Sequence, residues 1–323
     1  MQRRSLLNAA LPTLIAPGLA FIPTPSNAQA EALIIAEAGS AAYWLGVVEA
    51  AIPYIQAFSG LYSVLTTFGE NPQEARLKRI ELELKALSAQ ISKLEEVLKN
   101  LILDTVAKQL AAEVLGYRDS LDSYTSLKTQ GILDNVLTQS AITKNRLAQY
   151  IDDGATPHSF KFYFGSLLNA CTSLRMAAIG LYPATRESRE KLVLPEAKTF
   201  LARIPKITES AQFISDRRVK QDSRVEMFDE LGPIYGTVMS VTLDGKPYWN
   251  SFVVPRKGDG NRLSQMRTRA DAERKRAVEQ AYSQSVAPLL QNANAVQAML
   301  ADIGTRNPLA WKPVPSSIKA RLQ

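Results

Sequence analysis

Hydrophobic residues recur along most of this 323-residue chain at the three- and four-residue spacing that is typical of α-helices. The clearest case lies between residues 77 and 101, where leucine and isoleucine form four heptads with Lys, Arg and Glu between them. The pattern predicts a helix that begins at Pro72, can continue to Leu115 and ends at Gly116. Its apolar seam must be buried against another helix, of this chain or of a partner. The seam consists of Leu77, Ile80, Leu84, Leu87, Ile91, Leu94, Leu98 and Leu101.

A mostly apolar stretch at residues 40–69 precedes that helix, and Pro53 predicts a kink between two helical halves. The segment from Ala50 to Gly69 has no charged residue and is long enough to cross a bilayer, but its Gln, Ser and Thr residues make it less apolar than a typical spanning helix. A permanent spanning helix is therefore disfavoured. A buried bundle helix is favoured over a membrane-active one, although a soluble bundle can hide such a segment and release it. The candidate membrane-contact residues are Trp44, Tyr54, Phe58, Leu61, Tyr62 and Leu65.

Further helices are predicted at about residues 120–152, 160–182, 206–231 and 261–303. Gly131 is expected to break the first of them, and Pro288 to disturb the last. Prolines at 183, 195 and 205 predict a shorter, less regular region between the second and third.

One β-hairpin is predicted at residues 236–254, where Asp244-Gly245 supplies a two-residue turn with positive φ. The register expected from this turn makes one face largely apolar. It pairs Leu243 with Lys246, Val241 with Tyr248, Met239 with Asn250 and Thr237 with Phe252.

The expected fold is mainly α: an elongated bundle of five or six helices over residues 31–303, with one hairpin and a proline-containing tail at 304–323. Residues 1–30 read as a removable export signal, with Arg3 and Arg4 before a weakly apolar, proline-interrupted stretch and small residues at its end. The paired arginines are similar to a twin-arginine signal, and the general secretory route stays open. The predicted location is periplasmic or secreted.

Composition argues against most chemistry. Cys171 is the only cysteine and His158 the only histidine, so neither an intramolecular disulfide nor a zinc site is expected. Ser188 and Lys191 match S-x-x-K, as do Ser316 and Lys319, but the supporting K-T-G motif is missing. Without a glycine-rich phosphate loop either, we expect no cofactor, no metal and no enzyme activity.

The net charge of +7 is concentrated near one segment, because residues 256–276 carry eight basic and three acidic side chains. Arg262, Arg269 and Arg276 repeat every seven residues and form one stripe on a helix. Such a stripe suits anionic lipid headgroups, which makes these three arginines the candidate headgroup-binding residues. The alternative is a solvated helix face, and nucleic acid is not an expected partner.

An apolar hairpin-like segment beside a long heptad helix resembles the α-helical pore-forming toxins, such as the cytolysin-A-like rods and, more distantly, the helical bundle of insecticidal crystal toxins. The likeness is one of pattern and covers residues 40–116 best. It implies an exported, non-enzymatic, membrane-interacting protein that forms pores, with lipid as a conditional partner and residues 43–68 docking or inserting. The alternatives are a periplasmic or secreted scaffold, whose 77–101 seam binds a partner or makes a homo-oligomer, and an enzyme of unrecognised type.

Overall fold

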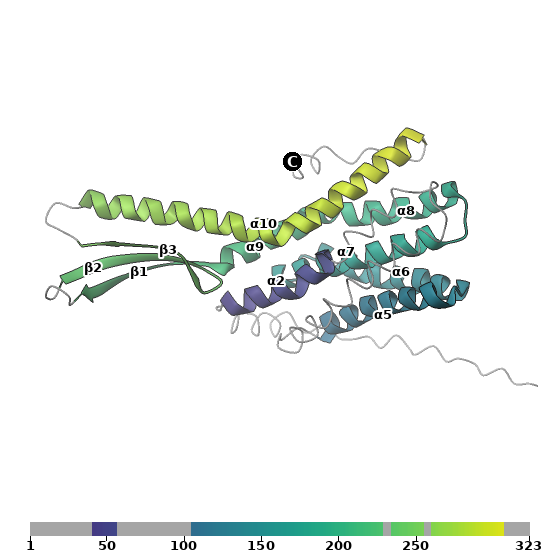
Figure 1. Ribbon diagram of the computed structural model, residues 1–323, viewed down its shortest axis with the longest axis horizontal. Helices are drawn as coiled ribbons and strands as arrows, with labels where there is room; N and C mark the ends of the chain where they lie inside the picture. Colours follow the sequence, from purple (N-terminus) through teal and green to yellow (C-terminus); the bar gives the residue numbers. More distant parts are fainter. Residues whose placement is uncertain (1–40, 57–104, 229–233, 255–259, 307–323) are drawn as a thin grey trace, which may run out of the picture.

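The molecule is elongated, with a helical bundle at one end and a narrower extension at the other (Figure 1). The computed structural model describes residues 41–56, 105–228, 234–254 and 260–306. The predicted export signal, the 77–101 seam and most of the tail lie outside the described residues. The mainly α expectation is confirmed.

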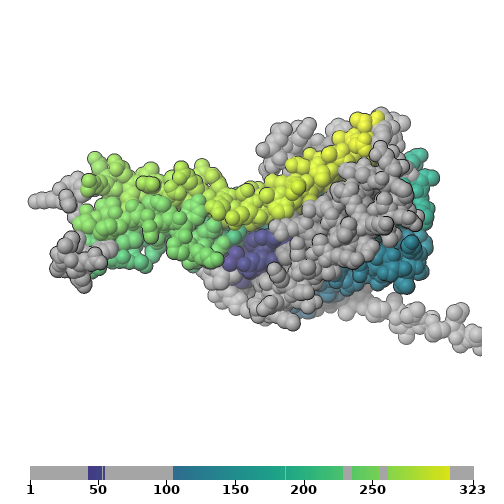
Figure 2. Space-filling view, viewed as in Figure 1, coloured from purple at the N-terminus to yellow at the C-terminus, as the bar shows by residue number. Residues whose placement is uncertain are grey.

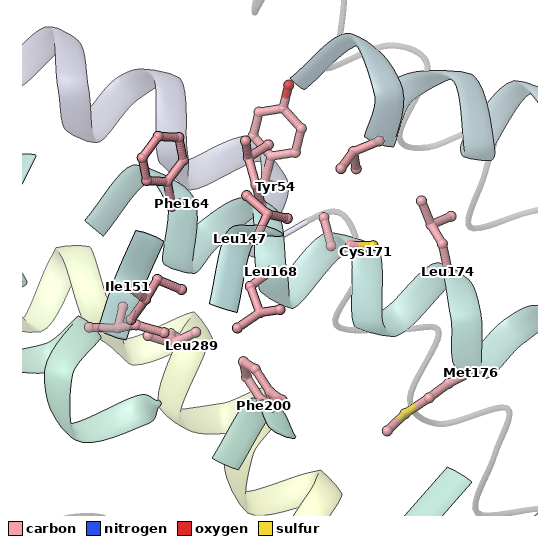
Figure 3. Close-up of a cluster of buried hydrophobic side chains, with 14 of the residues drawn as sticks. Tyr54, Leu147, Ile151, Phe164, Leu168, Cys171, Leu174, Met176, Phe200 and Leu289 are labelled. Carbon is pink, nitrogen blue, oxygen red and sulfur yellow. The ribbon is translucent and has the colours of Figure 1, made fainter. Parts of the chain in front are cut away.

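The bundle is built around one central helix, α7. Of its 24 residues, 21 are buried, and Figure 3 shows Leu168, Leu174 and Met176 of this helix among the core side chains. A helix that is apolar on all sides has to be covered on all sides, which explains its place in the core. The bundle helices are α2 (Ala41–Gln56), α5 (Thr105–Leu127), α6 (Gln130–Asp152), α7 (His158–Leu181), α8 (Arg186–Leu201), α9 (Ile204–Arg218) and the second half of α10 (Gly260–Arg306).

Two predicted helix boundaries near glycines are wrong. Helix α5 runs through Gly116 instead of ending there, because Val114 and Leu121 on either side are both buried in the core. A glycine inside a helix costs only about 1 kcal/mol relative to alanine, which such packing offsets. The expected break at Gly131 falls instead at Lys128, whose φ of 50° turns the chain between α5 and α6.

The proline-rich region at 183–205 is also more regular than expected. Pro195 lies inside α8, and Pro205 lies in the first turn of α9, where its missing N–H has no helical partner to lose. Helix α10 likewise continues through Pro288 and bends where it passes from the extension to the bundle (Figure 1).

The hairpin prediction is incomplete, since the extension contains a third strand. Strands β1 (Val219–Phe228), β2 (Ile234–Leu243) and β3 (Lys246–Val253) form an antiparallel sheet in the order β1-β2-β3. The helix predicted at 206–231 is therefore wrong from Val219 to Phe228, and residues 229–231 lie outside the described residues. Strand β1 is largely polar and lies at a sheet edge, so it lacks the apolar alternation that marks a half-buried strand.

The turn between β2 and β3 is confirmed, with φ of 54° at Asp244 and 74° at Gly245. The Leu243–Lys246 pair also occurs, but a bulge at Val241/Thr242 then shifts the register, and Val241 lies opposite Trp249. The other three predicted pairs, Val241–Tyr248, Met239–Asn250 and Thr237–Phe252, are each wrong by one residue, because a bulge adds a residue to one strand only.

Candidate functional site

We call the extension the arm and define it as β1, β2, β3 and residues 260–281 of α10. Figure 2 shows it as a narrow projection from the wider bundle. Helix α10 covers one face of the sheet: Met239 packs on Met266 and Ala270, and Val241 packs on Ala277 and Val278. Two small clusters thus replace the single large core of the bundle.

The base of the arm is fixed by Arg218, the last residue of α9, which is buried. Its Nε and Nη2 donate to the two carboxylate oxygens of Asp244 at 2.8 and 2.7 Å, and its Nη1 donates to Ser285 Oγ at 3.1 Å. A two-pronged guanidinium–carboxylate contact is directional as well as strong. It therefore holds the β2–β3 turn and α10 against the bundle, and the distal end of the arm is the end away from this turn.

Large apolar side chains are exposed toward the distal end. Seven large hydrophobic residues are exposed among the described residues, and four of them lie where β1 ends, β2 begins and β3 ends. Scattered exposed apolar residues are normal, whereas a cluster indicates a contact surface. These four are Val225 (68% exposed), Met227 (51%), Tyr235 (61%) and Phe252 (45%).

A shallow groove of about 600 Å³ lies between β3 and α10, and of the four exposed residues Phe252 lines it. Two arginines line it together with polar and apolar residues, so the groove combines positive charge with some apolar surface. We call it the distal groove. Its lining residues are Ser251, Phe252, Val253, Val254, Arg262, Gln265, Met266 and Arg269.

The three arginines predicted as a stripe are all exposed on α10, but the fold separates them. Arg262 and Arg269 line the distal groove. Arg276 lies nearer the bundle, where its Nη1 donates to Glu273 Oε1 at 2.8 Å. Residues 260–276 carry six basic and two acidic side chains, a net charge of +4, so the helix surface near the groove is strongly positive.

Trp44 and Tyr54, two of the candidate membrane-contact residues, lie in the bundle core at 3% and 2% exposure. The Trp44 ring meets Phe213 edge-on at 5.8 Å, and Tyr54 meets Tyr163 edge-on at 6.3 Å. Burial raises the pKa of the Tyr54 hydroxyl well above its usual value. The other four candidates, Phe58, Leu61, Tyr62 and Leu65, lie outside the described residues. None of the described helices combines the length and apolarity that crossing a bilayer needs.

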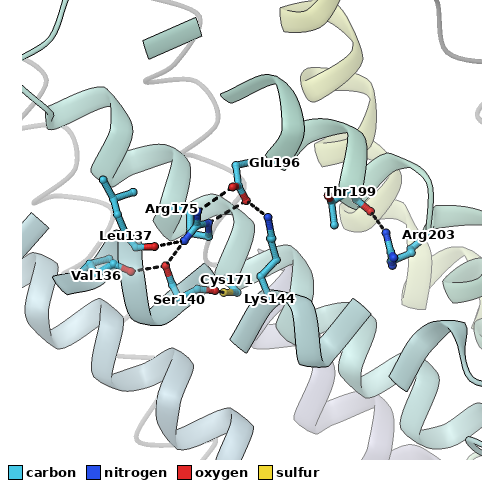
Figure 4. A network of polar contacts seen from close by, with 9 residues as sticks. All are labelled: Val136, Leu137, Ser140, Lys144, Cys171, Arg175, Glu196, Thr199 and Arg203. Atoms are coloured by element: carbon cyan, nitrogen blue, oxygen red, sulfur yellow. Dashed lines mark hydrogen bonds and ion pairs between the residues drawn. The ribbon is translucent and has the colours of Figure 1, made fainter. Parts of the chain in front are cut away.

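A buried ionic cluster joins α6, α7 and α8 (Figure 4). Glu196 accepts from Arg175 Nε and Nη2 at 2.9 and 2.8 Å and from Lys144 Nζ at 2.9 Å, and Arg175 also donates to Ser140 Oγ at 2.8 Å. Burial opposes ionisation, but the hydrogen bonds and charges of Arg175 and Lys144 outweigh it and lower the pKa of Glu196. The single carboxylate of Glu196 contacts both cations, and the buried contacts tie three helices together, so we interpret the cluster as a structural element.

The thiol of Cys171 lies beside this cluster and donates to the backbone oxygen of Ser140 at 3.5 Å. It is fully buried, and burial raises its pKa to about 12. A thiol that stays protonated and inaccessible is unreactive.

A second cleft, of about 570 Å³, lies between α7, α9 and α10 and is lined by His158, Thr208, Glu209, Gln212, Phe213 and Tyr282. The His158 ring stacks on Phe213 at 4.6 Å, and its Nδ1 lies 3.1 Å from Ser210 Oγ. Burial and the charge of Lys161 lower the pKa of His158, and Glu209 opposes them. Burial therefore favours the neutral form of the imidazole, which stacks on the Phe213 ring.

The S-x-x-K residues Ser188 and Lys191 have other partners at the start of α8. The Ser188 hydroxyl lies 2.9 Å from Thr185 Oγ1, and Lys191 Nζ lies 2.7 Å from Glu187. The second match, Ser316 and Lys319, lies outside the described residues. Across the part of the chain that the structure describes, His, Cys, Asp and Glu gather nowhere into a group of three that could hold a metal.

No protein-family model matches the chain, and the comparison with curated proteins finds no relative. Function therefore has to be inferred from the site itself. The sequence pattern identified Arg262 and Arg269 but missed Val225, Met227 and Tyr235. Charged residues at every second position from 220 to 226 fit a strand as well as a solvated helix, so this pattern alone does not show that Val225 is exposed.

Proposed function

We propose that this protein binds anionic membrane surfaces with the distal end of its arm. The observation that carries the proposal is the juxtaposition of Arg262 and Arg269 with the exposed Phe252 in the lining of the distal groove. The protein in this proposal is an exported, non-enzymatic, membrane-interacting protein, in keeping with the signal-like residues 1–30.

The chemistry of the site fits a lipid–water interface. Each arginine near an anionic surface contributes roughly 1 kcal/mol. Phe252 lines the groove together with the arginines, and Tyr235 is a second exposed aromatic residue, at the start of β2. Tyrosine in particular is enriched at the level of the headgroups. Arg262 and Arg269 would hold phosphate while the exposed apolar side chains enter the outer acyl region.

The toxin-like form of the proposal adds a second stage, in which residues 43–68 leave the bundle and enter the bilayer. Because Trp44 and Tyr54 are buried, this stage requires α2 to detach from α7 and α9. Binding and pore formation are thus separate events with separate readouts.

Vesicle flotation tests binding, using the chain without residues 1–30 and phosphatidylcholine vesicles with and without phosphatidylglycerol. We expect binding to the anionic vesicles and a weakening of about tenfold or more for Arg262→Glu/Arg269→Glu. Lys108→Glu/Lys198→Glu makes the same charge change on exposed helix positions of the bundle and should leave binding close to that of the unaltered chain.

The apolar part of the site is tested by Tyr235→Ser/Phe252→Ser, which should weaken binding while keeping its dependence on lipid charge. The proposal would be overturned if the protein bound neither kind of vesicle. It would also be overturned if the groove variant and the bundle variant lost the same amount of binding. Dye release from the same vesicles then separates pore formation from binding alone.

A further inference from the structure

Strand β1 presents an exposed edge. Among the described strands β2 is its only neighbour, and the six residues from Lys220 to Val225 are all exposed. An exposed edge of this length is a template for pairing with another strand.

The backbone hydrogen bonds show which groups of β1 point outward. The Asp244 N–H donates to the Arg218 carbonyl at 3.0 Å, and from this pair onward the even-numbered residues of β1 bond to β2. The amide and carbonyl groups of Gln221, Ser223 and Val225 therefore face away from the sheet. In agreement, the Ser223 N–H donates to the Asp222 side chain at 2.9 Å.

The side chains along β1 alternate in sign. Lys220, Asp222, Arg224 and Glu226 share the face opposite α10 and read plus, minus, plus, minus. Arg224 and Glu226 form an ion pair within the strand at 2.5 Å, but Arg224 is well exposed, so the pair contributes little.

We propose that β1 pairs antiparallel with β1 of a second copy of this chain, with Ser223 opposite its own equivalent. Lys220 then faces the partner's Glu226, and Asp222 faces the partner's Arg224. The outward amide and carbonyl groups of one Ser223 meet those of the other, so backbone bonding and charge agree on one register.

The neighbouring registers fail on charge. A shift by two residues in one direction places Asp222 opposite the partner's Asp222, and in the other it places Arg224 opposite the partner's Arg224. Like charges directly opposite one another destabilise a strand pair. A shift by one residue sets outward-facing backbone groups against groups already bonded to β2.

The resulting dimer has a two-fold axis normal to a six-stranded sheet. Both α10 helices lie on the same face of that sheet, and the two bundles lie at opposite ends. Val225 of each copy packs beside the partner's Gln221, and the exposed β1 edge of each copy is covered by the other.

Disulfide trapping tests the register. In the proposed dimer the two Ser223 Cα atoms are about 5.5 Å apart, which a disulfide can span. Ser223→Cys should therefore cross-link rapidly on oxidation. Gln221→Cys should not, because the two equivalents are offset by about 13 Å along the strands. Cys171 is fully buried and does not interfere.

Charge exchange tests the pairing by sedimentation velocity without lipid. The unaltered protein should be a dimer, and Asp222→Arg or Arg224→Asp should each weaken dimerisation about tenfold or more. The double exchange should restore it, and a mixture of the two single variants should form a heterodimer. Glu279→Arg, an exposed charge reversal on α10, is the matched control.

A protein that stays monomeric at its highest soluble concentration would overturn the proposal. So would a dimer that Asp222→Arg leaves unchanged, or equal cross-linking at positions 221 and 223. Since lipid is absent throughout, these outcomes are independent of whether the arm binds membranes.

Discussion

The bundle and the arm bury their residues in different ways. The bundle buries 21 of the 24 residues of α7 and contains a buried ionic cluster in which Glu196 contacts both Arg175 and Lys144. The arm is one helix on a three-stranded sheet, held by two small clusters and the Arg218–Asp244 contact. A region with few buried apolar contacts opens locally at a lower free energy than one with many. We therefore expect the arm to open more readily than the bundle.

The largest expected effect of a single substitution lies in the bundle. Glu196→Gln leaves the buried Arg175 and Lys144 without a counter-charge and should lower the free energy of unfolding by about 3–5 kcal/mol. Urea denaturation followed by circular dichroism measures it. Glu187→Gln removes an exposed pair with Lys191 and should change stability by less than about 0.5 kcal/mol. A small effect of Glu196→Gln would mean that water reaches the cluster.

The next effect should be confined to the arm. Arg218→Met removes the contacts to Asp244 and Ser285, and we expect a loss of roughly 2 kcal/mol. Hydrogen exchange should become faster in β2 and β3 while α7 keeps its protection. Arg274→Met breaks a more exposed pair with Asp216 and serves as the control, with less than about 1 kcal/mol expected. Equal acceleration in α7 would show that arm and bundle unfold as one unit.

Two glycines compare how the regions tolerate an added methyl group. In Gly165→Ala the new Cβ meets Ile207 at 2.6 Å inside the bundle, and a loss of about 1–3 kcal/mol is expected. In Gly236→Ala it meets the Phe252 ring at 2.0 Å, but that ring is partly exposed and can move toward solvent. The arm variant should therefore lose less stability despite the closer contact. Thermal unfolding of both variants measures the two losses. A larger loss for Gly236→Ala than for Gly165→Ala would contradict this expectation.

The smallest effect is a pH dependence that belongs to one residue. His158 is the only histidine, and its pKa is lowered by burial and by Lys161. The folded protein thus binds this proton less readily than the unfolded chain. Stability should fall as pH drops below the ordinary histidine pKa of about 6.5 toward the folded pKa. In His158→Gln the urea midpoint of unfolding should change less between about pH 7.5 and 5.5 than in the unaltered protein. An unchanged pH dependence of the midpoint would mean that other groups cause it.

Much of the fold could be read from local pattern. The apolar run of α7, the Asp244-Gly245 turn and the long helix α10 each follow from neighbouring residues, because helix period and turn conformation are local properties. Strand β1 could not be read in this way. Its polar side chains fit a solvated helix as well as a sheet edge, and only pairing with β2 selects the strand.

The candidate site divides along the same line. The seven-residue spacing of Arg262, Arg269 and Arg276 places them on one side of a helix, and this follows from the helix period alone. That two of them border a groove beside Phe252, while Arg276 turns to Glu273, depends on where β3 meets α10. The burial of Trp44 and Tyr54 likewise depends on α7 and α9, since the same apolar face would suit lipid. Spacing along a helix fixes which side chains share a face, but what that face meets is set by contacts between residues far apart in the chain.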